Sequence, residues 1–343
     1  MAKHPAEVDV AVLILFFTRP EPLKKVFDAI RQARPSKLYL YQDGPRGPQD
    51  MVGIEACRKV VCDEEIDWQC DVQRNYQTEN AGCDPSNFNA QKWAFSLSDK
   101  VVVFEDDSIP SVSFIHFCKE MLDRYEHDER IVMIEGFNTD EQSPDIPDDY
   151  FFTTVFSIWG WASWRRVIDQ WDEHYTFLDD KYNMHQLEAL MKERHYRHTM
   201  HRMAYDHRTS GKAYYESIFW HAMTLNHGLA IVPAKNMINN LGVMAGGSTH
   251  YAGSLETIPQ GLRRIFTMKR YELDFPLHHP RYVVENMDYL HRFYRVNAYN
   301  HPWVKIQYSL EELWLNVRYG NFAFIWKSLG NRVMKLLGRK NYR

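Results

Sequence analysis

The sequence predicts an α/β fold in which a mostly parallel sheet is flanked by helices. In the first 110 residues, short apolar runs alternate with segments of helical periodicity, which is the pattern of a doubly wound sheet. The chain has 343 residues, enough for one large α/β domain and an appendage. Its composition, 45% hydrophobic and 25% charged residues, is that of a folded globular protein.

Strands and helices are expected in alternation through this first half. The run Val10 to Phe17 is short and continuously apolar, which is typical of a strand buried on both faces. The helix after it is expected because Leu23, Val26 and Ile30 share one face. Strands are predicted at residues 10–17, 37–42, 67–76 and 100–104, and helices at residues 23–33, 49–61 and 88–98.

The second half is less regular. Helices are predicted at 114–125 and 216–226, helical structure at 179–202, and strands at 131–137 and 229–233. We expect one domain over residues 1–270, with a nucleotide-binding half (1–110) and an acceptor-binding half (111–270). Residues 271–343 are expected to form a helical, basic extension.

Charge and cysteine content narrow the class of protein. The formal net charge of −4 gives no basic field for nucleic acid, so no nucleic-acid partner is expected. Five cysteines without paired spacing favour a reduced, cytoplasmic protein. No run of about 20 apolar residues is present, so no membrane span is expected.

The C-terminal segment 318–343 contains Lys and Arg but no Asp or Glu, with apolar residues at near-helical intervals. Such a segment can lie on an anionic membrane, here the inner face of the cytoplasmic membrane. It can equally be a helix that packs on the domain with a solvated basic face. The sequence leaves both interpretations open.

Polar side chains follow three of the predicted strands. Thr18 and Arg19 follow the first strand, Asp43 follows the second, and Glu105-Asp106-Asp107 follows residues 100–104. Ligands of such sheets bind beyond the carboxyl ends of the strands. We therefore expect these groups, although far apart in the sequence, to share one crevice.

The acidic triplet predicts a divalent cation site. Adjacent carboxylates repel one another unless a cation lies between them. Mg²⁺ or Mn²⁺ held by one or two carboxylates, with phosphate oxygens as further ligands, is a common arrangement. The alternative is a solvated acidic turn or a helix cap, which the position directly after an apolar strand disfavours.

Two further side chains suit a nucleotide. Asp43 could accept a hydrogen bond from the N–H of a uracil-like base, although an Asp-Gly turn is the simpler interpretation. Arg19 could bind a phosphate through charge-assisted hydrogen bonds, and the alternative is an ordinary surface arginine.

Two candidate site residues, a possible general base and a possible metal ligand, lie in the second half of the chain. Glu216 could act as the general base that deprotonates an acceptor hydroxyl, or it could only complement the dipole of its helix. His250 ends the glycine-rich segment 246–250 and could bind the metal or a diphosphate, although that segment also suits a polar loop.

Taken in order, these segments resemble bacterial GT-A glycosyltransferases related to the N-acetylglucosaminyltransferase I family and the family 2-like group. The resemblance spans roughly residues 10–250. The segments that carry it are residues 12–20, 38–44, 79–83, 103–114 with Glu105-Asp106-Asp107, 157–164 with Gly160-Trp161-Ala162-Ser163-Trp164, and 233–250 with Asn236, Asn240 and His250.

The resemblance implies a role for each matching residue. The nucleotide-sugar would contact Thr18, Arg19, Asp43, Asn80, Gly82, Glu105 and Asp106. The acceptor would contact Trp159, Gly160 and Trp161, and Mn²⁺ or Mg²⁺ would bind Asp107 and His250. The family places its base in a Trp-Asp-like context, where this chain has Tyr215-Glu216.

The expected function is metal-dependent transfer of a sugar, with inversion, from a nucleoside diphosphate donor to a glycan hydroxyl. A UDP-sugar is the expected donor, and bacterial surface polysaccharide synthesis, with a lipid-linked acceptor, is the expected setting. One alternative is a sugar nucleotidyltransferase, which would want a glycine-rich loop after the first strand. Another is a non-catalytic, membrane-associated protein that keeps the fold.

Overall fold

The computed structural model describes residues 3–191, 193–242, 255–322 and 324–326. The strands are β1 (Val8–Phe16), β2 (Pro35–Gln42), β3 (Asp71–Tyr76), β4 (Lys100–Glu105), β5 (Ser108–Pro110), β6 (Ile131–Glu135), β7 (Tyr150–Thr153), β8 (Trp161–Trp164), β9 (Leu229–Pro233) and β10 (Ile238–Asn240). The helices are α1 (Pro20–Ala33), α2 (Met51–Val60), α3 (Cys83–Leu97), α4 (Val112–Arg124), α5 (Arg165–Ile168), α6 (Lys181–Leu190), α7 (Arg194–Ser210), α8 (Tyr215–Leu225), α9 (Gln260–Arg263), α10 (Met287–Val296) and α11 (Pro302–Arg318).

The main sheet has eight described strands in the order β3-β2-β1-β4-β8-β6-β9-β7. Its first four strands are mutually parallel, and β1 lies between β2 and β4 with Val12 opposite Leu38 and Val102. In the other half β6 and β9 are parallel, whereas β8 and β7 run antiparallel to their neighbours. The predicted fold class, a mostly parallel Rossmann-like α/β sheet, is therefore confirmed.

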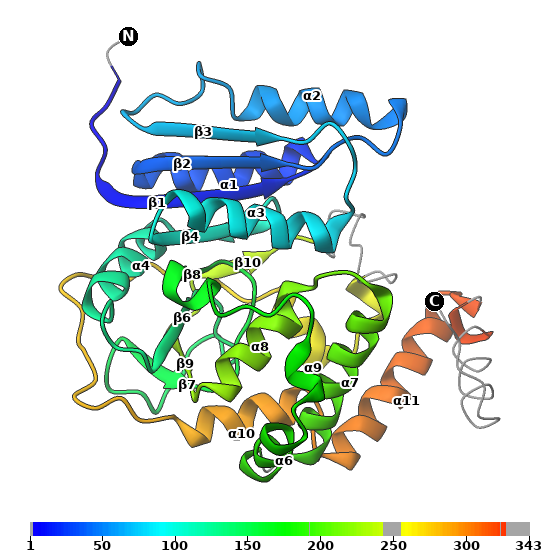
Figure 1. Cartoon of the computed structure of the whole chain (residues 1–343). Helices are drawn as coiled ribbons and strands as arrows, with labels where there is room; N and C mark the ends of the chain where they lie inside the picture. Colours follow the sequence, from blue (N-terminus) through cyan, green and yellow to red (C-terminus); the bar gives the residue numbers. More distant parts are fainter. Residues whose placement is uncertain (1–2, 192, 243–254, 323, 327–343) are drawn as a thin grey trace.

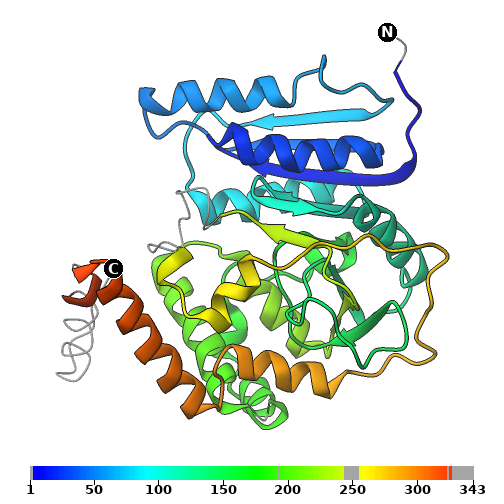
Figure 2. The same cartoon turned by 180° about the vertical axis from the view of Figure 1, so that it is seen from behind.

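Helices cover both faces of this sheet. Figure 1 shows α3 in front of the strands and α1 behind them, and Figure 2 shows the same layers from the other side. The inner side of α1 is fully buried at Leu23, Val26 and Ile30, as their shared helical face predicts. Because layers lie on both faces, β1 is continuously apolar and buried from Val10 to Phe16.

A second, two-stranded sheet closes the edge where the parallel strands end. In it, β5 and β10 pair antiparallel, with Ser108 opposite Asn240. The turn between β4 and β5 carries Asp106 and Asp107, and Asp107 O accepts a hydrogen bond from Leu241 N at 2.8 Å. This small sheet was not predicted, and it fixes the position of the acidic turn.

The stretch 179–202 is largely helical, as predicted, but it is not a single helix. It is divided into α6 and α7, and the carboxylate of Glu193 caps α7 by accepting the backbone N–H of Tyr196. A capping carboxylate satisfies a free N–H of the first helical turn, which stabilises a new helix start there. The predicted helices at 114–125 and 216–226 correspond to α4 and α8.

The segment after residue 270 returns to the sheet before its helices begin. Glu272 accepts hydrogen bonds from the N–H groups of Val112 and Ser113 at the start of α4, at 3.0 and 2.7 Å. Tyr289 of α10 is buried against Phe151 of β7, with ring centroids 4.6 Å apart. Within the described residues, every helix is too short or too polar to cross a lipid bilayer.

Candidate functional site

Arg19 joins the carboxyl ends of β1 and β4. Its Nη2 donates hydrogen bonds to Asp106 Oδ1 and, at 2.9 Å, to Asp107 Oδ2. The two strands are adjacent and parallel, so the residues that follow them meet at the same edge. The structure thus brings together two of the three strand-end groups that the sequence singled out. Thr18 lies beside them and packs closely on Gly53 of α2, where an added Cβ would lie 2.7 Å from Thr18 O.

The acidic turn carries more negative charge than Arg19 alone offsets. Burial raises the pKa of Asp106, although the neighbouring Arg19 opposes this shift. Burial lowers the pKa of Arg19, but attraction to Asp106 and Asp107 more than reverses that effect. Loss of hydration, with repulsion from Asp107 and Glu216, raises the pKa of Glu105 well above its ordinary value. Clustered carboxylates of this kind favour an additional cation.

Asp107 is also held from the side of β10. Its Oδ1 accepts a hydrogen bond from Asn240 Nδ2 at 3.2 Å. Gly242 approaches so closely that an added Cβ would lie 2.9 Å from Asp107 Oδ2. The small sheet therefore orients this carboxylate, a contribution that the sequence did not reveal.

The donor chemistry fits a divalent cation bound mainly through its substrate. Asp106 and Asp107 supply carboxylate oxygens, which Mg²⁺ and Mn²⁺ prefer, and phosphate oxygens would complete the coordination. Among the described residues, no group of three or more His, Cys, Asp and Glu is arranged to hold a metal by itself. His250, the other predicted ligand, lies outside the described residues.

Asp43 has a different environment from the acidic turn. Its two oxygens accept four hydrogen bonds, at 2.9–3.0 Å, from the backbone N–H groups of Gly44, Ala81 and Gly82 and from Asn80 Nδ2. A carboxylate has about four acceptor positions, so the chain itself fills them. Asp43, Asn80 and Gly82 thus lie together, as the resemblance implied, but they bind one another. A base could reach Asp43 only if the loop 80–82 moved.

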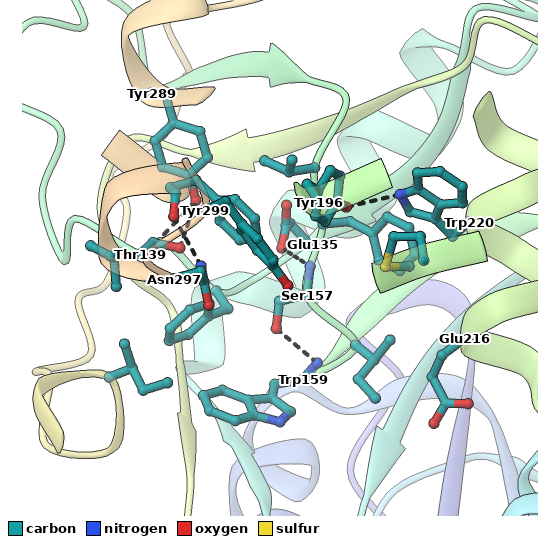
Figure 3. Close-up of a pocket in the computed structure, with 18 residues that line it drawn as sticks. Glu135, Thr139, Ser157, Trp159, Tyr196, Glu216, Trp220, Tyr289, Asn297 and Tyr299 are labelled. Carbon is teal, nitrogen blue, oxygen red and sulfur yellow. Dashed lines mark hydrogen bonds between the residues drawn. The ribbon is translucent and has the colours of Figure 1, made fainter. Parts of the chain in front are cut away.

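A cavity of about 310 Å³ is lined by residues from the second half of the chain. Figure 3 shows its aromatic walls and the two carboxyl groups that line it. The labelled lining residues come from the end of β6 and the segment after it, the segment before β8, helices α7, α8 and α10, and the turn after α10: Glu135, Thr139, Ser157, Trp159, Tyr196, Glu216, Trp220, Tyr289, Asn297 and Tyr299. Aromatic walls with a few polar groups suit the apolar face and the hydroxyls of a sugar.

Glu216 lies between this cavity and the acidic turn. It lines the cavity, and its charge contributes to the raised pKa of Glu105. Burial, together with repulsion from Asp84, raises the pKa of Glu216 to about 7. A carboxyl group with this pKa can accept and release a proton near neutral pH, which general base catalysis requires.

The predicted acceptor segment has one aromatic ring in the cavity and one in the core. Trp159 lines the cavity, with its ring 4.9 Å from that of Phe137. Gly160 has a φ of 67°, which favours glycine, and an added Cβ would lie 2.7 Å from Ile238 Cδ1. Trp161 is only 1% exposed and stacks on Tyr215. The prediction that Trp161 contacts an acceptor directly is therefore not supported by its position.

Sequence reasoning missed Glu135, which ends β6 at the cavity. It is 1% exposed, its Oε2 accepts the N–H of Ser157 at 2.7 Å, and its Oε1 has no hydrogen-bond partner among the described residues. Burial raises its pKa well above the ordinary value. A carboxylate that ends the apolar run 131–134 was the available signal, because such a group is rarely buried without a partner.

Glu135→Gln should make unfolding less dependent on pH. The raised pKa means that the folded protein keeps a proton that the unfolded chain releases above about pH 4.5. The wild type should therefore lose about 1.4 kcal/mol of stability per pH unit, relative to the variant, from pH 5 upward until Glu135 ionises. Urea unfolding of both proteins at pH 5 and pH 7 measures this difference, and parallel pH profiles would contradict it.

Comparisons with known proteins give no family for the chain. No family model matches it, and no curated protein matches it. A solved structure of a UDP-glucose pyrophosphorylase in complex with UDP-glucose is similar at a TM-score of 0.34 and 8% identity, over 69% of this chain and 95% of that one. A mycobacterial protein is similar at a TM-score of 0.28 and 12% identity, over 47% of this chain and 54% of that one. Both similarities are too distant to bear on activity.

Proposed function

We propose that this protein transfers a sugar, with inversion, from a nucleoside diphosphate sugar to a hydroxyl group of a glycan acceptor. A UDP-sugar is the expected donor, and bacterial surface polysaccharide synthesis is the setting that the family resemblance suggests. The observation that carries the proposal is the adjacency of two features. The Arg19-Asp106-Asp107 cluster lies at the strand ends, and an aromatic cavity begins at Glu216 beside it.

The cluster suits a diphosphate. The guanidinium of Arg19 can turn from the carboxylates to phosphate oxygens, to which it would donate charge-assisted hydrogen bonds. Asp107 would hold Mn²⁺ or Mg²⁺ together with the diphosphate, and Asn240 keeps this carboxylate oriented. When bound, the cation would neutralise the charge that develops on the leaving diphosphate.

Glu216 suits the acceptor. A hydroxyl of a sugar held against Trp159 can donate a hydrogen bond to the Glu216 carboxylate, which then removes its proton as the hydroxyl attacks the donor sugar. The position of Glu216 between the cavity and the acidic turn supports this role. The oxygen would attack from the side opposite the diphosphate, which gives inversion.

The segment after β1 argues against a sugar nucleotidyltransferase. Such an enzyme must bind a triphosphate, commonly through a glycine-rich loop after the first strand. Here α1 begins at Pro20 directly after Arg19, and the segment Thr18-Arg19-Pro20-Glu21-Pro22 contains no glycine. Two prolines in the first turn also lack the N–H groups that would bind phosphate.

Titration calorimetry with UDP, GDP and CMP, each with and without Mn²⁺, tests the donor site. We expect UDP to bind only when metal is present, and UDP-sugars then to be hydrolysed slowly without an acceptor. Binding of GDP instead of UDP would still support a sugar transferase, but with a guanine nucleotide in the donor. Pyrophosphate release from UTP and a sugar 1-phosphate would favour the nucleotidyltransferase, and no binding of any nucleotide would overturn the proposal.

A further inference from the structure

Helix α11 exposes an apolar stripe along one side. Apart from the adjacent pair Leu313 and Trp314, the residues of the stripe follow one another at intervals of three or four, so they share one helical face. Trp303 is 80% exposed and Trp314 is 55% exposed. The stripe consists of Trp303, Ile306, Leu310, Leu313, Trp314 and Val317, all of them exposed.

The other side of α11 is fixed to the body of the protein. Tyr308 Oη donates a hydrogen bond to Val296 O at 3.2 Å, and Glu311 Oε1 accepts the N–H of Gln260 at 2.8 Å. Leu315 and Asn316 are buried. Figures 1 and 2 show α11 at the periphery of the molecule. Because the inner side is anchored, the stripe faces outward in a defined orientation.

Helix α11 itself carries two positive and two negative side chains, and the sequence that follows it is basic. Lys305 and Arg318 are exposed on α11, and Arg318 lies over the ring of Trp314 at 5.1 Å. Residues 318–343 contain seven Lys and Arg and no Asp or Glu, so the formal net charge of −4 combines +7 from this segment with −11 from the rest. The sequence that directly follows the stripe therefore has a net positive charge.

We propose that the stripe of α11, together with the basic sequence that follows it, docks on the surface of an anionic lipid bilayer. Tryptophan side chains favour the headgroup region, and each nearby Lys or Arg strengthens attraction to anionic lipid. The remainder of the chain has a formal net charge of −11, which an anionic membrane would repel.

Docking in this way would bring the cavity close to the lipid surface. Val296 at the end of α10, and Asn297 and Tyr299 in the connection to α11, line the cavity. A glycan acceptor carried on a lipid could then reach the cavity without leaving the membrane. This consequence rests on the proposed function, whereas the docking itself does not.

Flotation of the full chain with lipid vesicles tests the proposal. We expect binding to vesicles of phosphatidylcholine and phosphatidylglycerol in equal parts, weak binding to phosphatidylcholine alone, and release as salt is raised. The double variant Trp303→Glu/Trp314→Glu should bind at least about tenfold more weakly. The substitutions remove apolar area that the membrane would bury, and they lower the net positive charge of the docking surface. Val52→Glu is the matched control, since Val52 is 79% exposed on α2 and should leave binding unchanged.

Three results would overturn the proposal. The first is that the wild type does not float with the anionic vesicles, and the second is that the tryptophan variant floats as well as the wild type. The third is that the wild type forms a dimer by light scattering, the tryptophan variant is monomeric, and neither binds vesicles. Circular dichroism checks that the variants fold. Hydrolysis of UDP-sugar without vesicles should be equal in the wild type and the tryptophan variant, so failure of docking and failure of the proposed activity are distinguishable.

Discussion

Asp107→Asn should abolish metal-dependent binding of UDP and reduce sugar transfer below detection. The substitution removes the negative charge that a divalent cation requires while it keeps the shape of the side chain. We expect the affinity for UDP in the presence of Mn²⁺ to fall by about 100-fold or more, because the cation and the diphosphate are bound together. Calorimetry with and without Mn²⁺ measures the loss directly.

The matched control is Asp67→Asn. Asp67 also accepts a hydrogen bond from an arginine, Arg31, at 2.6 Å, but it lies outside the candidate site. This variant should bind UDP and Mn²⁺ as the wild type does. Both variants should fold, since Arg19 keeps its contact with Asp106 when Asp107 is changed. If Asp107→Asn retained metal-dependent UDP binding, Asp107 would not be the metal ligand.

Glu216→Gln should lower kcat by about 100-fold to 10,000-fold while UDP binding is unchanged, because only the proton acceptor is lost. The pKa of Glu216 is raised to about 7, so the carboxylate form that acts as a base is populated as pH rises through 7. The wild-type kcat should therefore increase between pH 6 and pH 8 and then level off. The residual rate of the variant should lack this increase.

Asp84→Asn provides a second test of the same group. Repulsion from Asp84 contributes to the raised pKa of Glu216, after burial. Its removal should lower that pKa and move the increase in kcat to lower pH, with the plateau rate preserved. If Glu216→Gln keeps the wild-type kcat and Asp84→Asn loses it, Asp84 is the base.

The parallel half of the sheet was predictable because its signals are local. The apolar run that forms β1 and the alternation of strands with helices predicted the elements. Because ligands of such sheets bind beyond the carboxyl ends of the strands, the same elements then pointed to Arg19 and the acidic turn. The three-residue strands β5 and β10 were missed because they are too short to show periodicity. The insertion of β8 between β4 and β6 depends on long-range pairing that no local pattern encodes.

The candidate site was predictable as a location, but less so in its details. The sequence showed that Asp43 follows a strand, but not that loop 80–82 folds back to saturate its carboxylate. It also could not separate Trp159 from Trp161, because the side that each ring faces depends on the turn at Gly160 and on packing against α8. Glu135 was missed because the strand was predicted from its apolar residues alone, and the single carboxylate at its end was not considered.

The ion pairs of Arg19 with Asp106 and Asp107 should couple the binding of metal to the binding of nucleotide. A guanidinium tethered beside the carboxylates competes with any free cation at high effective concentration. A diphosphate offers that guanidinium another partner and so frees Asp107. Metal alone should therefore bind weakly, and UDP should strengthen Mn²⁺ binding by the same factor by which Mn²⁺ strengthens UDP binding. In the resting protein, such a competition would keep divalent ions out until a donor is present.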